Sequence, residues 1–145
     1  MKFCKKPAKK VFTKDLDGNT NGYLVELNKD NDLTTSYLTV AFAGCFKGFH
    51  LHTVRESNYI CIKGKVKIIL YTKEGFKEYI LDSSNPEKLN IPINIPTGIS
   101  NEWDEEAWLV NFPNPPYDPN LIGEQIDYKK EELTTYLWDN LKNGK

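Results

Sequence analysis

Two histidines, His50 and His52, occupy alternate positions in the stretch Phe49–His52, and the sequence contains no others. Residues i and i+2 of a β-strand point to the same face, so the two imidazoles are expected side by side. Imidazole exchanges protons near neutral pH and is also a common metal ligand. Glu56 follows across a short turn and would bring a carboxylate to the same place. The segment therefore predicts either a proton-transfer site or a metal site.

A second element, Ile95–Asn101, combines Pro96 and Gly98 with a polar end. Proline and glycine together favour a tight turn, which would return the chain to the mouth of the same cavity. Asn101 would then face inward or outward depending on the register of its strand.

Short runs of alternating hydrophobic and polar residues, separated by turn residues, predict that most of the chain is β-structure. The predicted strands are Gly22–Asn28, Ser36–Ala43, Asn58–Ile62, Lys65–Thr72, Phe76–Leu81, Leu89–Ile95 and Ala107–Phe112. Evenly spaced strands without intervening helices indicate a sandwich or a barrel.

The pattern also predicts a hairpin, an edge strand and a C-terminal helix. Lys63-Gly64 is predicted to join Asn58–Ile62 and Lys65–Thr72 as a hairpin. Pro92 cannot donate a ladder hydrogen bond, so its strand is expected at a sheet edge or in an irregular stretch. The spacing of Leu133, Tyr136, Leu137 and Leu141 predicts a helix within 128–141.

Length and composition restrict the function. The 145 residues suit one domain, residues 1–145, and a net charge of −1 gives no indication of nucleic acid or a membrane surface as partner. No apolar run approaches the roughly 20 residues that span a bilayer, and no signal peptide is expected. Three widely spaced cysteines, Cys4, Cys45 and Cys61, favour reduced thiols and a cytoplasmic protein.

The stretch Gly44–Gly64 resembles the first motif of the cupins, and Pro96–Asn101 resembles the second, with Asn101 where cupins usually have a histidine. The resemblance implies an all-β cupin jelly-roll barrel with a short C-terminal helix. Cupins often bind a metal, and His50, His52 and Glu56 could hold one here as a facial triad. The missing second-motif histidine favours a metal-free site without a cofactor.

The neighbourhood of the histidines narrows the resemblance. Lys47–His52 and the hairpin Tyr59–Ile68 are similar to the dTDP-4-keto-6-deoxyglucose 3,4-ketoisomerases, whose active-site tyrosine corresponds to Tyr37. Leu89–Gly98 and Phe112–Pro119 resemble the dTDP-4-dehydrorhamnose 3,5-epimerases, whose acid tyrosine corresponds to Tyr117. The resemblance also implies a homodimer.

These features together predict a metal-independent epimerase or ketoisomerase acting on a nucleotide-linked 4-keto-6-deoxy sugar, and the resemblance implies that the nucleotide is dTDP. His50 is the expected base, His52 its partner or the second proton carrier, and Tyr37 and Tyr117 are candidate acids. The expected substrate-binding residues are Lys47 and Arg55 for the diphosphate, Tyr59 and Trp103 for the base, and Asn101. Two alternatives remain: a metal-binding cupin, such as a dioxygenase or sugar-phosphate isomerase, and a non-catalytic sugar- or nucleotide-binding cupin.

Overall fold

The computed structural model describes residues 10–29, 35–115 and 118–133 of the chain. This part of the chain is almost entirely β-structure. In chain order the elements are β1 (Lys10–Lys14), β2 (Thr20–Lys29), β3 (Thr35–Ala41), β4 (Phe46–His52), β5 (Ser57–Lys63), β6 (Lys65–Thr72), β7 (Gly75–Asp82), β8 (Lys88–Ile91), β9 (Thr97–Ser100), β10 (Ala107–Asn111), β11 (Gln125–Asp127) and α1 (Lys130–Leu133).

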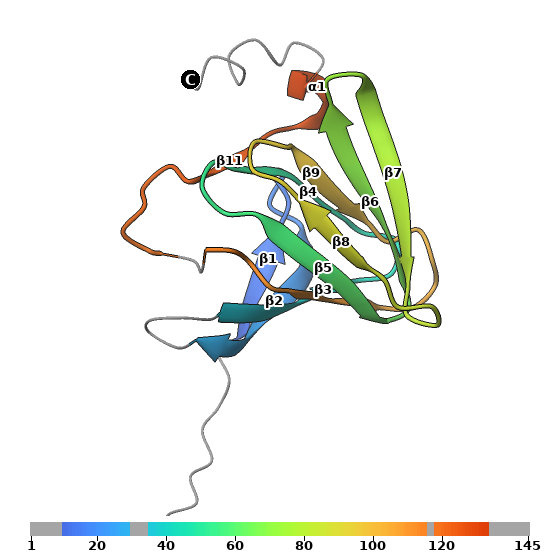
Figure 1. Cartoon of the computed structure of the whole chain (residues 1–145). Coiled ribbons are helices and arrows are strands. Elements are labelled where there is room, and N and C mark those ends of the chain that lie inside the picture. The colour runs from blue at the N-terminus through green and yellow to red at the C-terminus, as the bar shows by residue number, and fades with distance from the viewer. Residues whose placement is uncertain (1–9, 30–34, 116–117, 134–145) are drawn as a thin grey trace, which may run out of the picture.

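The strands form two antiparallel sheets that face each other (Figure 1). One has six strands in the order β1-β2-β3-β10-β5-β8, and the other has five in the order β11-β4-β9-β6-β7. Among the described residues the two sheets are not hydrogen-bonded into a closed barrel. The prediction of an all-β cupin jelly roll is confirmed, in the form of two facing sheets.

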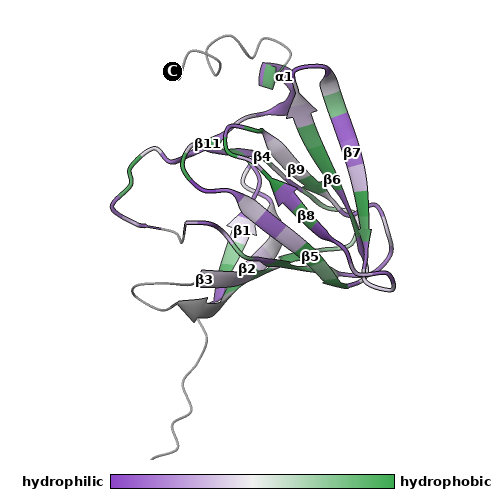
Figure 2. Cartoon of the chain, viewed as in Figure 1, coloured by the Kyte–Doolittle hydropathy of each residue, from purple (hydrophilic) through white to green (hydrophobic). Residues whose placement is uncertain are grey.

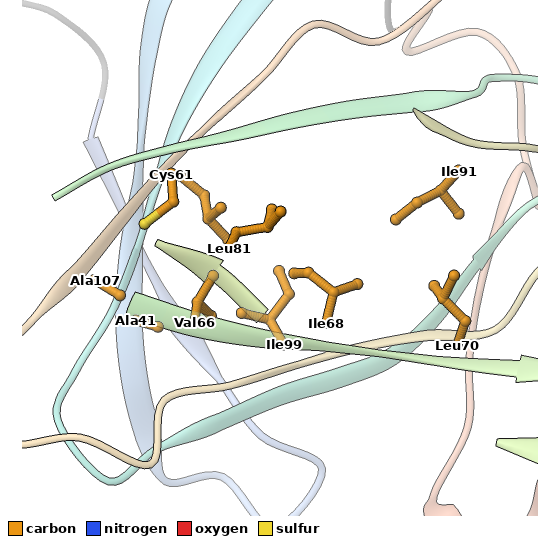
Figure 3. Close-up of a cluster of buried hydrophobic side chains, with 10 residues drawn as sticks. Ala41, Cys61, Val66, Ile68, Leu70, Leu81, Ile91, Ile99 and Ala107 are labelled. Atoms are coloured by element: carbon orange, nitrogen blue, oxygen red, sulfur yellow. The ribbon is translucent and has the colours of Figure 1, made fainter. Parts of the chain in front are cut away.

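A hydrophobic core fills the space between the sheets. Hydrophobic and hydrophilic segments follow one another along the strands (Figure 2). Along β6 the buried side chains are those of alternate residues, Val66, Ile68 and Leu70, which point to the interior. The core residues come from both sheets (Figure 3): Ala41, Cys61, Val66, Ile68, Leu70, Leu81, Ile91, Ile99, Ala107 and Leu109. This packing makes the two sheets the rigid frame on which β4 and its neighbours are held.

The predicted hairpin about Lys63-Gly64 is wrong. β5 pairs with β8 and β10, whereas β6 pairs with β7 and β9 in the other sheet. Gly64, with a φ of 70°, turns the chain from one sheet to the other, and a Cβ there would lie 2.7 Å from the Glu106 carbonyl oxygen. Alternation along a strand specifies which side chains are buried and leaves the partner strand undetermined.

The edges of the fold contain the other differences from the prediction. β8 is an edge strand that ends at Ile91, so Pro92 lies outside the ladder as its missing N–H requires. β1 and β11 are additional edge strands that the sequence pattern did not indicate. The described part of the C-terminal helix is Lys130–Leu133. Tyr128 and Lys129 lie before it and are not helical, and residues 134–141 of the predicted helix lie outside the described residues. No helix in the described part of the chain is long and apolar enough to cross a membrane.

Candidate active site

A cavity opens between the two sheets at the end of the core where β4, β5, β8 and β9 meet. It contains about 360 Å³ of space not filled by atoms, part of which is open to solvent. The apolar side chains around it are Ile91, Pro92, Ile95 and Ile99. The polar side chains around it are His50, His52, Arg55, Ser57, Tyr59 and Thr97. An apolar pocket with a few convergent polar groups is the usual form of a small-molecule site.

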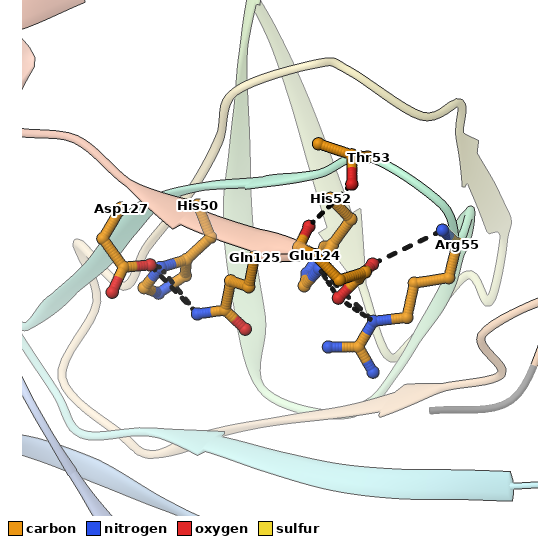
Figure 4. A network of polar contacts seen from close by, with 7 residues as sticks. All are labelled: His50, His52, Thr53, Arg55, Glu124, Gln125 and Asp127. Atoms are coloured by element: carbon orange, nitrogen blue, oxygen red, sulfur yellow. Dashed lines mark hydrogen bonds and ion pairs between the residues drawn. The ribbon is translucent and has the colours of Figure 1, made fainter. Parts of the chain in front are cut away.

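His50 is paired with a carboxylate on the neighbouring strand (Figure 4). β11 runs antiparallel to β4 and sets Asp127 directly opposite His50, where Asp127 Oδ1 lies 2.6 Å from His50 Nδ1. Gln125 Nε2 donates a second hydrogen bond to the same oxygen at 3.0 Å. Because a carboxylate only accepts hydrogen bonds, the shared proton belongs to Nδ1, and the lone pair of the ring is then on Nε2.

His52 has a more enclosed environment. Its Nδ1 lies 3.3 Å from Glu124 Oε2, and the Arg55 Nε lies 3.3 Å from the same oxygen. The side chains of His52 and Glu124 are 19% and 6% exposed, compared with 39% and 45% for His50 and Asp127. The site therefore contains two imidazole–carboxylate pairs, one open to solvent and one buried.

The electrostatics of the two pairs differ accordingly. Burial, followed by the charge of Arg55, lowers the pKa of His52, and the charge of Glu124 opposes this effect. The hydrogen bond from His50 lowers the pKa of Asp127, so that carboxylate is ionised at neutral pH. The buried imidazole is therefore neutral at neutral pH, and the open imidazole lies against a negative charge.

Tyr59 provides a hydroxyl group at the cavity wall. Its side chain lines the cavity from β5 and hydrogen-bonds with Ser57. Burial raises the pKa of Tyr59, so its hydroxyl stays protonated at neutral pH and can donate a hydrogen bond. The structure thus brings Tyr59 to the cavity, and its stacking on a nucleotide base stays a prediction.

Two other predicted site residues are not among the side chains that line the cavity. Lys47 is buried between the sheets, where its Nζ donates to the Val40 carbonyl oxygen at 3.2 Å. Burial lowers the pKa of Lys47 to about 8. Tyr37 is buried on β3, and Tyr117 lies outside the described residues. Of the predicted diphosphate ligands, only Arg55 lies at the cavity.

The second-motif residues Asn101 and Trp103 also lie away from the cavity lining. Asn101 is 1% exposed, and its side-chain amide donates to the carbonyl oxygens of Ala41 and Glu105 at 3.0 and 2.8 Å. Its Oδ1 accepts a hydrogen bond from the Trp103 N–H at 3.1 Å. Asn101 thus holds the turn that follows β9, because a buried amide needs partners for all its polar atoms.

The residues present do not fit a cupin metal site. Glu56 is turned away from the histidines and accepts a hydrogen bond from Asn90 Nδ2 at 3.2 Å. Ser57, the next residue, faces the cavity in its place. Asn101 is occupied by backbone groups, and within the described ranges no three His, Cys, Asp or Glu side chains are grouped to hold a metal. The donors His50, His52 and Glu56 therefore do not converge.

Three polar residues of the site were missed by the sequence reasoning: Glu124, Gln125 and Asp127. They belong to a short segment with exposed strand residues, where neither periodicity nor a hydrophobic run marks a strand. The alternation Gln125–Ile126–Asp127 was the one available signal, and three residues are too few for a pattern to be recognised.

Comparison with known proteins assigns the chain to a family. Residues 12–132 match the family model described as FdtA, WxcM-like, C-terminal. A probable low-salt glycan biosynthesis epimerase, Agl13 of Haloferax volcanii, is 24% identical over 124 residues, which cover 74% of this chain and 80% of that protein.

Solved structures share the fold at low sequence identity. The capsular polysaccharide assembling protein CapF of Staphylococcus aureus superposes with a TM-score of 0.70 at 21% identity over 84% of this chain. The chain spans about a third of the CapF length, since the match covers 34% of that chain. A cupin-2 domain protein of Rhodospirillum rubrum, Rru_A2000, gives a TM-score of 0.67 at 11% identity and covers 93% of this chain and 84% of that one.

Proposed function

Since the chain belongs to the FdtA family of WxcM-like C-terminal domains, we propose that it is a metal-independent epimerase or ketoisomerase of a nucleotide-diphosphate-linked 4-keto-6-deoxy sugar. The family and the probable epimerase of Haloferax volcanii support a sugar-modifying cupin enzyme of the isomerase class. The observation behind the proposal is that two imidazoles line one cavity, each with a carboxylate at its Nδ1.

The chemistry begins with proton removal by His50. A carbonyl group acidifies the hydrogen on the adjacent carbon, and the Nε2 lone pair of His50 accepts that proton while the bonding electrons move into the carbonyl to form an enolate. Asp127 stabilises the resulting imidazolium through its 2.6 Å contact with Nδ1. Tyr59, which remains protonated, can donate a hydrogen bond to the enolate oxygen.

The second half of the reaction returns a proton. Delivery to the opposite face of the same carbon inverts its configuration and gives an epimer. Delivery to the former carbonyl carbon, with transfer of the neighbouring hydroxyl's proton to the former carbonyl oxygen, moves the keto group and gives an isomer. His52 lies two residues from His50 on the same face of β4 and is the second proton carrier of the isomer route, in which its Nε2 lone pair accepts the hydroxyl proton and passes it to the former carbonyl oxygen. The epimer route needs an acid on the other side of the sugar ring, for which Tyr37 and Tyr117 are the candidates.

The proposal predicts exchange of carbon-bound hydrogen with solvent. A dehydratase-generated 4-keto-6-deoxy nucleotide sugar, incubated with the wild-type protein in deuterated water, should gain deuterium next to the keto group, as measured by NMR or mass spectrometry. Wild-type protein without uptake, or His50→Asn with full uptake, would refute the assignment. Glu74→Gln, on the exposed turn after β6, is a control that should keep wild-type uptake. A sugar that binds and is recovered unlabelled would indicate a binding protein instead.

A homodimer forms part of the proposal. Val11 and Phe12 on the edge strand β1 are 45% and 59% exposed, and an edge strand with apolar side chains is usually covered by a partner. Light scattering at micromolar concentration should give twice the monomer mass of 16.7 kDa. Replacement of Phe12 by Lys should shift the mass toward the monomer, and an unchanged mass would place the interface elsewhere.

A further inference from the structure

Arg55 is the single arginine of a chain with 19 basic residues, the other 18 being lysines. Its Nε lies 3.3 Å from Glu124 Oε2 and 3.3 Å from His52 Nδ1. A planar guanidinium directs its donors in fixed directions, which a lysine ammonium does not, so an arginine is suited to hold a carboxylate in a defined orientation. The position of Arg55 thus indicates a contact that depends on geometry as well as charge.

Glu124 is the centre of this contact. Its carboxylate is almost fully buried and receives Arg55 Nε and His52 Nδ1 at Oε2, and the Arg55 backbone N–H at Oε1 at 3.4 Å. Its backbone carbonyl accepts hydrogen bonds from the N–H and the hydroxyl of Thr53 at 2.9 and 3.3 Å. A buried carboxylate requires a compensating cation, and Arg55 provides it. Glu124 is therefore fixed at both its backbone and its side chain.

Arg55 Nε, Glu124 Oε2 and His52 Nδ1 lie 3.3 Å from one another, and this contact bears on which nitrogen of His52 carries the proton. Arg55 Nε–H lies 3.3 Å from both Glu124 Oε2 and His52 Nδ1, and Glu124 Oε2 can only accept. If Arg55 Nε–H donates to the carboxylate, which is the stronger acceptor, His52 Nδ1–H can donate to the same oxygen. A neutral imidazole protonated at Nδ1 presents the lone pair of Nε2, and His52 is one of the residues that line the cavity. Without Glu124, Arg55 Nε–H would be left to donate to His52 Nδ1, which favours the Nε2–H tautomer.

Within the described ranges, four charged or titratable groups interact electrostatically with His52. Arg55 and His50 disfavour its protonated form, and Glu124 favours it. Asp127, on the adjacent strand β11, also interacts electrostatically with His52. Loss of Arg55 would leave the buried carboxylate unopposed beside the imidazole, and loss of Glu124 would leave the guanidinium unopposed. The two substitutions should therefore move the titration of His52 in opposite directions.

We propose that Arg55 and Glu124 form a positioning pair that fixes the His52 ring with Nδ1–H on the carboxylate and Nε2 toward the cavity. Arg55 then acts through Glu124 and His52, and it is not the ligand of a diphosphate. This inference builds on the proposed function only in treating the cavity as the site of reaction.

The test uses ¹⁵N NMR of the histidine side chains, which does not require a substrate. The two histidines give two imidazole signals, which His50→Asn assigns. Wild-type His52 should show the chemical shifts of the Nδ1–H tautomer. Arg55→Met should raise the pH at which His52 titrates, and Glu124→Gln should lower it and increase the Nε2–H tautomer. Lys65→Met, which removes a cation from the ion pair with Asp82, is the matched control and should leave His52 unchanged.

Kinetics distinguish a positioning arginine from a phosphate ligand. Arg55→Met should lower kcat by about 10- to 100-fold and shift its pH profile, with KM within about twofold, because supporting residues act through the group they orient. Arg55→Lys should restore the wild-type direction of the His52 titration, since it keeps the charge. A large rise in KM with an unchanged His52 titration would overturn the inference and assign Arg55 to the diphosphate.

The test does not depend on the folding of any single variant. If Arg55→Met does not give a dispersed backbone spectrum, Arg55→Lys and the nearly isosteric Glu124→Gln provide the comparison. An Nε2–H tautomer in the wild-type protein would overturn the inference whatever the enzyme assay shows. Conversely, absence of isomerase activity with the expected His52 tautomer would refute the proposed function and leave the positioning pair intact.

Discussion

The two motif segments, on β4 and at the end of β9, are neighbours in one sheet. The first supplies side chains to the cavity, and the second stabilises a turn of the backbone. On β4, His50 and His52 face the cavity, and each is matched with a carboxylate. After β9, Asn101 is buried with its amide bonded to backbone groups of its own turn. The difference shows that a polar residue at a motif position serves the site only when its polar atoms are left for a ligand.

The largest expected effect that tests this comparison is the loss of activity in His52→Asn. Because general acid–base residues contribute about 10²- to 10⁴-fold to rate, kcat should fall by that factor. Glu124 keeps Arg55 as its partner, so the free energy of unfolding should change by less than about 1 kcal/mol. Steady-state kinetics and urea unfolding measure the two quantities. A variant that retains activity would remove His52 from the mechanism.

Asn101→Ala should show the reverse behaviour. Removal of the Asn101 side-chain amide leaves the buried carbonyl oxygens of Ala41 and Glu105 without that hydrogen-bond donor. The loss should lower the free energy of unfolding by about 3 kcal/mol. Activity per folded molecule should stay within about twofold. Asn90→Ala, at an exposed amide, is the control and should change stability by less than about 1 kcal/mol. If Asn101→Ala abolished turnover at unchanged stability, Asn101 would belong to the site.

Lys47→Met extends the comparison to the start of β4. Burial lowers the pKa of Lys47 to about 8 from the ordinary value of 10.5, so the unfolded chain binds a proton more tightly than the folded one. The wild-type protein should therefore gain stability as pH rises from 8 to 10.5, and its charged Lys47 costs stability below that range. At pH 7 the Lys47→Met variant should be up to about 3 kcal/mol more stable than the wild type. Its free energy of unfolding should not show the increase between pH 8 and 10.5 that deprotonation of Lys47 gives the wild type.

Urea unfolding at several pH values between 7 and 10.5 measures this difference. Lys65→Met, at an exposed lysine, should follow the wild-type curve in this range. Equal pH dependence in wild type and Lys47→Met would show that Lys47 is solvated in solution. Loss of nucleotide-sugar binding in Lys47→Met would restore Lys47 as a ligand of the diphosphate.

The smallest expected effect belongs to Asp127→Asn, at the open end of the site. The hydrogen bond from His50 lowers the pKa of Asp127 below 3.8, so its stabilising contribution is present above that pH and is lost as the pH falls through the folded value. The stability difference between Asp127→Asn and the wild type should therefore vanish in acid. kcat should fall about tenfold, since the base loses its charged partner. A pH-independent difference would contradict an ionised Asp127.

The short period of a β-strand made part of the site predictable. Alternation alone sets His50 and His52 on one face, and the structure places both at one cavity. The same alternation could not identify strand partners, which is why β5 and β6 lie in different sheets. Glu56 and Ser57 differ by one position and point to opposite sides, so the turn after β4 decided which of them reached the cavity.

The sequence by itself determined a β-sheet fold, a pair of histidines on one face and the absence of a second-motif histidine. Only the tertiary structure decided which charges meet them. Glu124 and Asp127 are about seventy residues away in the chain, and they reach the imidazoles because β11 pairs with β4 in one register. Local propensities fix backbone conformation and side-chain direction over a few residues, whereas contacts between distant strands depend on the packing of the whole fold.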